Sequence, residues 1–144
     1  LSQYAAANGG PTPRHPAGIP LWKPPYSRIT AIDMNSGDHL WMIPAGYTPE
    51  RVQNLPELTG VDIGNTGSGA VGPMVVTDTV LIYGNVTSDG EPHLFALDKQ
   101  TGVEVARVQA PALSRYGMSS WIHDGRQYVI LQTGSSLTAM ALPN

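Results

Sequence analysis

The sequence predicts an all-β chain that forms part of a β-propeller, and three observations support this fold class. Glycine (16 residues) and proline (13 residues) make up about a fifth of the 144 residues, which favours short strands and tight turns over long helices. Segments with the alternation of strands follow one another at intervals of about 8–12 residues. A strand–turn–strand pattern also recurs at a spacing close to that of propeller blades, about 40–50 residues.

Nine strands are expected in the C-terminal part of the chain, residues 28–144. In chain order they cover residues 28–33, 39–44, 74–77, 80–84, 93–98, 103–109, 119–123, 127–132 and 137–142. These strands make half a blade (28–44), one complete four-stranded blade (74–109) and three strands of another (119–142).

Two segments fall outside this pattern. Residues 1–27 are rich in proline and glycine and are expected to be irregular, either as a linker or packed through Leu21, Trp22 and Tyr26. Residues 45–72 form an insertion loop, in which we expect only a short helical turn near residues 49–54 with Thr48 as its N-cap.

The repeat has the pattern A-x-D-x-x-x-G-x-x-x-W. The first copy is Ala31, Asp33, Gly37 and Trp41, the second is Ala96, Asp98, Gly102 and Ala106, and a third begins at Thr138-Ala139-Met140-Ala141. The aspartate can cap the turn by accepting backbone amides, and the glycine supplies a positive φ angle. The tryptophan can lie flat between neighbouring blades. The two aspartates are therefore expected to be structural rather than a catalytic acid and base.

Composition excludes several classes of function. Only 13% of the residues are charged, the net charge is −3 and no Lys/Arg cluster occurs, so nucleic acid is not an expected partner. Without cysteine there is neither a disulfide framework nor a thiolate metal site. The longest apolar runs, such as Val80–Tyr83, are much shorter than the roughly 20 residues that span a bilayer. Because the N-terminus lacks a methionine and the regions of a signal peptide, we expect the chain to belong to a longer protein.

Few other residues suggest chemistry. The four histidines have no metal-ligand spacing, so a metal role is not expected. Asn85-Val86-Thr87 matches a glycosylation sequon by pattern only.

The repeat resembles the tryptophan-docking motif of the PQQ-dependent quinoprotein dehydrogenases, whose fold is an eight-bladed propeller. Residues 24–37, with Pro24-Pro25-Tyr26 at their start, resemble a segment of the membrane-type glucose, quinate and shikimate branch. Residues 125–130 (Gly-Arg-Gln-Tyr-Val-Ile) and the ending 139–143 resemble two further strands of that branch. The resemblance covers residues 21–143 and implies the C-terminal part of such an enzyme, about two four-stranded blades of the eight-bladed propeller.

The resemblance implies an activity and its cofactors. The whole enzyme is expected to oxidise a sugar or polyol hydroxyl with PQQ and calcium and to pass electrons to a membrane quinone or a cytochrome. It is expected in the periplasm, with any membrane association through a part not present here. The family's catalytic aspartate, calcium ligands and most quinone contacts match nothing in this chain, so no catalytic or metal-binding residue is assigned.

Two loops lead into innermost strands, where the family places its cofactor. The first (65–73) offers Thr66 and Gly67 as candidate cofactor contacts, and the second (113–118) offers Arg115 and Tyr116. Arg115 could pair with a quinone carboxylate, and Tyr116 could stack on or border the ring system. The alternative is that the glycine-rich loop is only a flexible connection and Arg115 a solvated surface charge.

Two other interpretations remain open at this point. A non-catalytic propeller scaffold for protein–protein interaction would share the docking motif but bind no quinone, although residues 24–26 and 125–128 favour the dehydrogenase. The chain could also be a fragment with no function of its own. About two blades cannot close a ring, so we expect the chain to need the remaining propeller blades and to be inactive alone.

Overall fold

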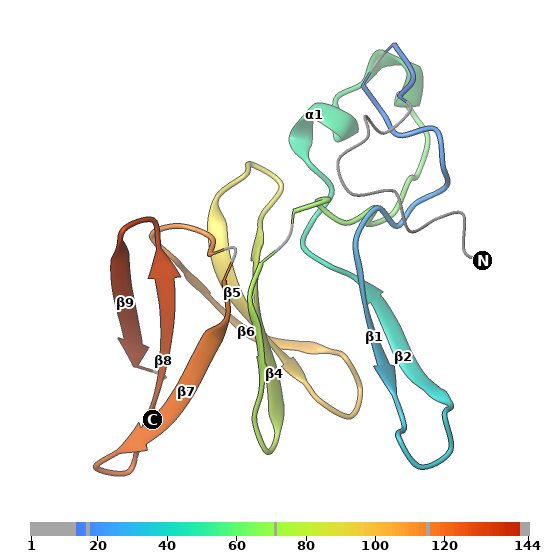
Figure 1. The fold of residues 1–144 in the computed structure, drawn as a ribbon. Coiled ribbons are helices and arrows are strands. Elements are labelled where there is room, and N and C mark those ends of the chain that lie inside the picture. The colour runs from blue at the N-terminus through green and yellow to red at the C-terminus, as the bar shows by residue number, and fades with distance from the viewer. Residues whose placement is uncertain (1–13, 17, 71, 115, 142–144) are drawn as a thin grey trace, which may run out of the picture.

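The computed structural model describes residues 14–16, 18–70, 72–114 and 116–141 and contains three separate antiparallel sheets (Figure 1). The first sheet pairs β1 (Arg28–Ile32) with β2 (His39–Pro44). The second has β3 (Met74–Val76), β4 (Val80–Val86), β5 (Pro92–Asp98) and β6 (Glu104–Gln109), and the third has β7 (Met118–His123), β8 (Arg126–Thr133) and β9 (Ser136–Ala141). In each sheet the spatial order of strands is their order in the chain.

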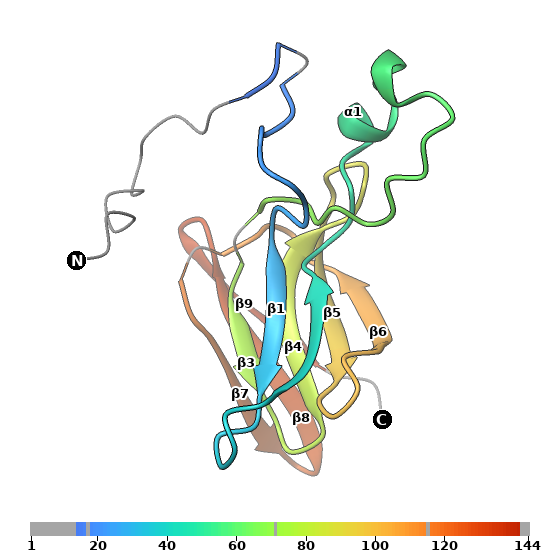
Figure 2. The ribbon, with the colours of Figure 1, turned by 90° about the vertical axis from the view of Figure 1, so that its right-hand side faces the viewer.

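The three sheets lie face to face, one behind another (Figure 2). The second sheet is covered on both faces because β4 and β5 direct alternate apolar side chains to opposite sides. One core cluster, between the first and second sheets, consists of Ile29, Ala45, Leu81, Tyr83, Phe95 and Leu97. The other, between the second and third sheets, consists of Ile82, Leu94, Ala110, Met118, Val129 and Leu131. The predicted fold class, an all-β partial propeller, is confirmed.

The repeat forms its two turns as predicted. Oδ1 of Asp98 accepts hydrogen bonds from the amides of Gln100 (3.1 Å) and Thr101 (2.8 Å), and Asp33 does the same in the β1–β2 turn. Gly102 has a φ angle of +73°, which residues with a side chain rarely adopt. These contacts are local, so the motif alone determines the hairpin.

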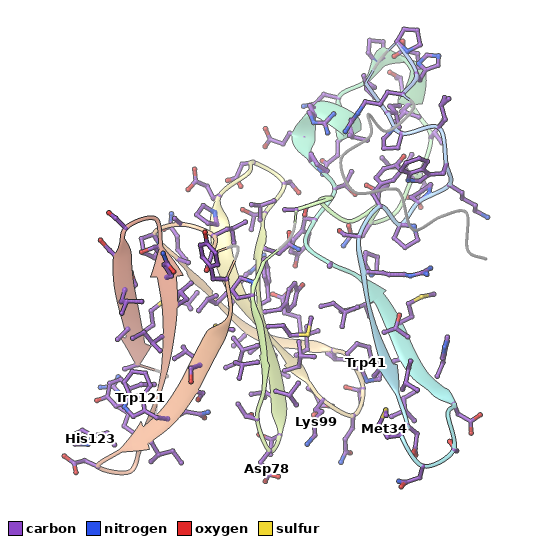
Figure 3. The ribbon with its side chains drawn as sticks, in the orientation of Figure 1. Met34, Trp41, Asp78, Lys99, Trp121 and His123 are labelled. Carbon is purple, nitrogen blue, oxygen red and sulfur yellow. The ribbon has the colours of Figure 1, made fainter. Side chains whose placement is uncertain are left out.

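Trp41 connects the first sheet to the second. Its side chain points from β2 toward the second sheet (Figure 3), and its indole Nε1 donates a hydrogen bond of 3.0 Å to the carbonyl oxygen of Lys99. The ring lies so close to Gly102 that a Cβ atom there would be 2.7 Å from it. The predicted position of this tryptophan between neighbouring sheets is therefore confirmed.

Ala106 occupies the matching position in the second repeat. It pairs with Ala96 as Trp41 pairs with Ala31, and both pairings are followed by a register shift at the same place. Ala106 is exposed, and a groove of about 230 Å³ beside it is lined mainly by apolar side chains, among them Val129 and Met140. The second interface therefore lacks the ring that crosses the first.

The insertion contains a short helix, α1 (Glu50–Gln53), and a single 3₁₀ turn (Pro56–Leu58). The prediction that Thr48 caps this helix is wrong, because Pro49 is the N-cap residue and no side chain bonds the first turn. Thr48 is buried instead, and its hydroxyl forms hydrogen bonds with Gly64 and Thr66 in the loop that follows. No helix among the described residues is long and apolar enough to cross a membrane.

Candidate cofactor-facing rim

The loops that lead into β3 and β7 lie at the end of the sheets opposite the β1–β2 turn (Figure 1). We call this end the rim and define it as residues 26–27, 45–48, 64–70, 72–73, 111–114 and 116–117. The insertion rises from the same end, so the rim combines the start of the insertion with both loops that the sequence singled out.

The two loops meet over Gly84 of β4. The amide of Gly84 donates to the carbonyl oxygen of Pro73 (2.8 Å), and a Cβ atom on Gly84 would lie 2.8 Å from Pro73 Cδ and 3.5 Å from Leu113 Cδ2. A Cβ atom on Gly72 would lie 1.9 Å from the carbonyl oxygen of Gly84. Both glycines are therefore needed so that the backbone can pass at this distance.

Thr66 lies inside its loop and is 2% exposed. Its amide donates a 2.8 Å hydrogen bond to the hydroxyl of Thr48, and its carbonyl oxygen accepts one of 2.7 Å from the amide of Tyr26. The Thr48 hydroxyl donates in turn to the carbonyl oxygen of Gly64 (3.2 Å). Thr48 thus acts as a bridge between the two ends of the insertion.

Gly67 is also buried, with a φ angle of +71°. A Cβ atom at this position would lie 2.6 Å from the carbonyl oxygen of Ser27, so no side chain fits. The Gly67 amide donates to Oδ1 of Asn65 (2.9 Å). The backbone and hydroxyl groups that make Thr66 and Gly67 candidate contacts thus have partners within the protein.

Tyr116 differs from these two residues because 66% of it is exposed. Its backbone is held by Ser114, whose hydroxyl accepts from the Tyr116 amide (3.0 Å) and is itself almost fully buried. Arg115, the neighbouring candidate, lies outside the described residues. No hydrogen bond within the described part of the chain joins Tyr116 to Thr66 or Gly67. The role of all four candidates (Thr66, Gly67, Arg115 and Tyr116) as cofactor contacts stays a prediction.

Ser27 of the rim and Asn85 of β4 both hold the rim loops in place, and the sequence did not identify either of them in this role. Asn85 is 2% exposed, and its Oδ1 accepts hydrogen bonds from the Ser68 hydroxyl and from the amide of Val86 (2.8 Å). Ser27 joins the loops through its hydroxyl, which donates to the carbonyl oxygen of Ala45 (2.8 Å). The sequon at Asn85 is therefore buried and not accessible to a glycan.

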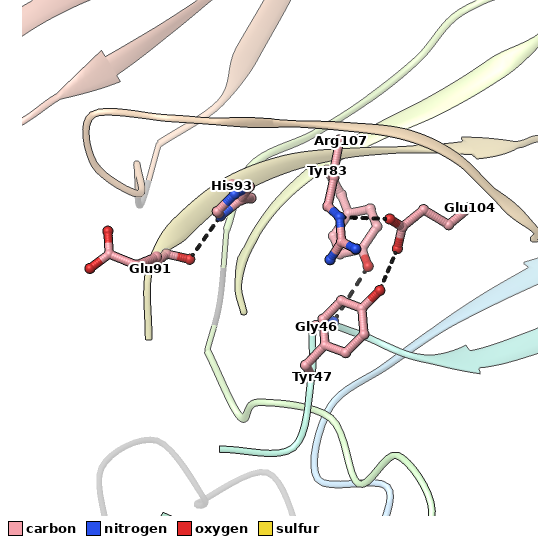
Figure 4. Close-up of polar contacts among 7 residues, drawn as sticks. All are labelled: Gly46, Tyr47, Tyr83, Glu91, His93, Glu104 and Arg107. Atoms are coloured by element: carbon pink, nitrogen blue, oxygen red, sulfur yellow. Dashed lines mark hydrogen bonds and ion pairs between the residues drawn. The ribbon is translucent and has the colours of Figure 1, made fainter. Parts of the chain in front are cut away.

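A cluster of aromatic and charged side chains lies below the rim, between the first and second sheets (Figure 4). The Tyr83 ring stacks on Phe95, with 5.1 Å between centroids, and its hydroxyl accepts from the Gly46 amide (3.4 Å). Burial raises the pKa of Tyr83. Burial also raises the pKa of Tyr47, with a further contribution from the hydrogen bond to Glu104. Both phenols are therefore neutral donors or acceptors at neutral pH.

The described residues contain no group of three or more His, Cys, Asp or Glu side chains that could hold a metal ion. The carboxylates of Asp89 and Asp98 accept hydrogen bonds from backbone amides of their own turns. Hydrogen bonds from the hydroxyls of Thr87 and Thr101 lower the pKa of Asp89 and Asp98, respectively. Among the described rim candidates, Tyr116 presents an exposed aromatic ring, whereas Thr66 and Gly67 are buried.

Comparison with known proteins identifies the family. The sequence model of one protein family, the PQQ-dependent glucose/ethanol/alcohol dehydrogenase β-propeller domain, matches residues 3–129. The chain belongs to this family. The predicted membership of the PQQ-dependent quinoprotein dehydrogenases is thereby confirmed.

Curated relatives of this quinoprotein chain are much longer. It is 28% identical over 124 residues to the quinate/shikimate dehydrogenase (quinone) of Acinetobacter baylyi. This alignment covers 83% of this chain and 14% of that protein. It is 31% identical over 119 residues to the glycerol dehydrogenase large subunit of Gluconobacter thailandicus. This alignment covers 81% of this chain and 15% of that protein. The matched part of the chain thus corresponds to about one-seventh of the length of these relatives.

Proposed function

We propose that the protein containing this quinoprotein chain uses PQQ to oxidise a hydroxyl group of a sugar or polyol. The chain contributes closing blades of an eight-bladed propeller and part of the ceiling over the cofactor. The observation that carries this proposal is the packing of Trp41 against the Lys99–Gly102 turn of the next sheet, which is a contact between neighbouring blades. The names of the relatives, which act on quinate, shikimate or glycerol, support a hydroxyl-bearing substrate.

The chain is proposed to work only together with the remaining blades. A cleft of about 780 Å³ separates β1 from β3 and β4, and its lining includes Ile29, Trp41 and Met74. In the first sheet, Leu40 and Met42 are 57% and 52% exposed. Such apolar surface favours association with a partner, and two further strands next to β1 would complete a four-stranded sheet. We expect the isolated chain to be inactive.

The rim is proposed to border PQQ at one edge. When bound, PQQ accepts two electrons from the alcohol. Tyr116 presents an exposed ring that can lie against a planar quinone, and Arg115 would pair with one of its carboxylates. Thr66 and Gly67 would contribute through the shape of their loop, because their polar groups are already bonded. These residues fit one part of a cofactor site and not a whole one, so calcium and its ligands are assigned to blades outside this chain.

The electron acceptor is proposed to be a membrane quinone or a cytochrome, in the periplasm. The word "quinone" in the name of the quinate/shikimate dehydrogenase of Acinetobacter baylyi supports a quinone as the acceptor. Any membrane association would use a part of the protein beyond this chain.

Binding of PQQ to the full-length protein tests the proposal. The protein would be titrated with PQQ in the presence and absence of calcium, with tryptophan fluorescence as the signal, and then assayed with glucose, glycerol and quinate and an artificial electron-accepting dye. We expect saturable, calcium-dependent binding and dye reduction with at least one substrate. Absence of PQQ binding in a folded protein would favour a non-catalytic scaffold.

A further inference from the structure

Three side chains join the outer strand of the second sheet to the first residues of the insertion (Figure 4). We call Tyr47, Glu104 and Arg107 the Tyr47 cluster. The Tyr47 hydroxyl donates a 2.9 Å hydrogen bond to Oε2 of Glu104, and Arg107 Nε lies 3.4 Å from the other carboxylate oxygen. The Arg107 guanidinium carbon also lies 5.4 Å from the centroid of the Tyr47 ring. Glu104 thus has one partner on each oxygen, and Tyr47 contacts both charged residues.

Tyr47 is also attached to the second sheet through its backbone and its ring. Its amide donates to the carbonyl oxygen of Val86 (3.3 Å), and its ring centroid lies 5.9 Å from that of Phe95, which is fully buried. The backbone of Tyr47 is therefore held by β4, and its side chain by β5 and β6. None of these strands belongs to the insertion that contains Tyr47.

Tyr47 is followed in the chain by Thr48, whose carbonyl oxygen also accepts a 2.7 Å hydrogen bond from Gln53 Nε2. The Thr48 hydroxyl accepts the amide of Thr66 at 2.8 Å and donates to the carbonyl oxygen of Gly64 at 3.2 Å. Because the two residues are adjacent, we expect a shift of Tyr47 to loosen the contacts of this hydroxyl with both partners. A continuous series of contacts therefore runs from the outer strand β6 through Tyr47 and Thr48 to the loop at 64–67.

We propose that Glu104 is a positioning residue that, with Arg107, holds Tyr47 and thereby fixes the contact between Thr48 and Thr66. The Tyr47–Glu104 bond joins residues 57 positions apart and crosses from the first sheet's insertion to the second sheet. The inference rests on the proposed function in one respect only, which is that the loop so fixed belongs to the cofactor-facing rim. A hydroxyl donating to a carboxylate is a charge-assisted bond, stronger than one between neutral groups.

Hydrogen exchange of the Thr66 amide in the full-length protein tests this role directly. Glu104→Ala and Tyr47→Phe each remove the bond between the two side chains, and each is expected to accelerate exchange at Thr66 about threefold to tenfold, the range that one lost hydrogen bond produces. Exchange at Tyr83 and Phe95, in the core strands, should not change. Because the two side chains act as one unit, the double variant should be no faster than either single variant.

Two further variants separate positioning from a general loss of stability. Glu104→Gln keeps an oxygen that can accept from Tyr47, so it should restore most of the protection at Thr66. Glu57→Ala removes an exposed carboxylate of the insertion that has no hydrogen bond or ion pair with the described residues, so it should have no effect. Unchanged exchange at Thr66 in Glu104→Ala and Tyr47→Phe would overturn the proposal, as would equal acceleration at Tyr83 and Phe95.

The PQQ affinity of the same variants is measured separately. Faster exchange at Thr66 together with weaker PQQ binding would support both the positioning role and the proposed place of the loop. Faster exchange with unchanged PQQ affinity would support Glu104 as a positioning residue but contradict the assignment of the loop to the cofactor site. The two hypotheses therefore fail in different ways.

Discussion

The two interfaces between neighbouring sheets arise from the same repeat but are held in different ways. Across the first, the indole of Trp41 bonds the Lys99 carbonyl and the hydroxyl of Tyr47 bonds Glu104. Across the second, Ala106 stands where the tryptophan would be, and the apolar side chains of the second core cluster pack between the two sheets. The contacts described at the second interface are thus mainly apolar, without a docked ring.

This difference separates two roles within one motif. The aspartate and glycine act inside their own hairpin, so the second sheet forms its turn although its tryptophan position holds alanine. The tryptophan acts on the next sheet and contributes nothing to its own turn. Loss of the ring therefore leaves a blade intact and weakens only its contact with the neighbour, so we expect the second interface to open before the first.

Removal of Trp41 should have the largest effect on this contrast. Trp41→Ala in the full-length protein is expected to lower the free energy of unfolding by about 2–4 kcal/mol, because it deletes a large packed ring and a hydrogen bond. Denaturation with guanidinium measures the change. Trp22→Ala, which removes a side chain from a residue 52% exposed, serves as control and should cost less than about 1 kcal/mol. Equal losses in the two variants would contradict the docking role.

Gly102→Ala should have the next largest effect. Its Cβ atom would lie 2.7 Å from the Trp41 ring, and its φ angle of +73° is strained for alanine, so we expect a loss of about 2 kcal/mol. Gly37→Ala is a matched control, since Gly37 has a φ angle of +81° in the equivalent turn but no atom within 4 Å of the Cβ position. It should lose only the conformational part, about 1 kcal/mol. In a Trp41→Ala background the two substitutions should become equal, and a persistent difference would show that the ring is not the cause.

Ala106→Trp should strengthen the second interface, so that its stability comes closer to that of the first. A ring at this position can enter the groove of about 230 Å³ between the second and third sheets, and we expect a gain of about 1 kcal/mol in the free energy of unfolding. Val103→Trp adds the same ring at a residue 60% exposed and should give no gain. A stability loss in Ala106→Trp would mean that the groove does not accept the ring of the motif.

Alkaline pH should weaken the first interface selectively, with the smallest effect of the four. Burial raises the pKa of Tyr83 and of Tyr47, both of which pack in the first core cluster. Since the folded state holds these protons more tightly than the unfolded chain, stability is complete below about pH 10 and falls as the pH rises past the ordinary tyrosine pKa. Denaturation midpoints on either side of this pH would measure the loss, and Tyr83→Phe should reduce it. An unchanged loss in that variant would contradict the assignment.

The sequence predicted the parts of the fold that depend on neighbouring residues. All nine strands lie within two residues of their expected bounds, and the Asp98 turn was predicted because its partner Thr101 is three residues away. The family was predicted from the same repeat. These features need no knowledge of distant parts of the chain.

The remaining features depend on residues far apart in the chain. The Thr48 hydroxyl was expected to cap the adjacent helix, but its partner is Thr66, 18 residues further on. The Tyr47–Glu104 bond likewise joins residues 57 apart, and neither residue has a sequence pattern that indicates the other. Of the rim candidates, Tyr116 is exposed whereas Thr66 is buried, a difference that their shared position in loops before inner strands did not indicate.

An experimental structure of the full-length protein with PQQ and calcium bound tests the central claim most directly. We predict that the three sheets are consecutive blades of a closed ring, with Trp41 on Gly102 and the ring of Tyr116 at the edge of the quinone. A structure in which these sheets pack on one another without facing a common axis, or in which Trp41 contacts no neighbouring blade, would contradict the account.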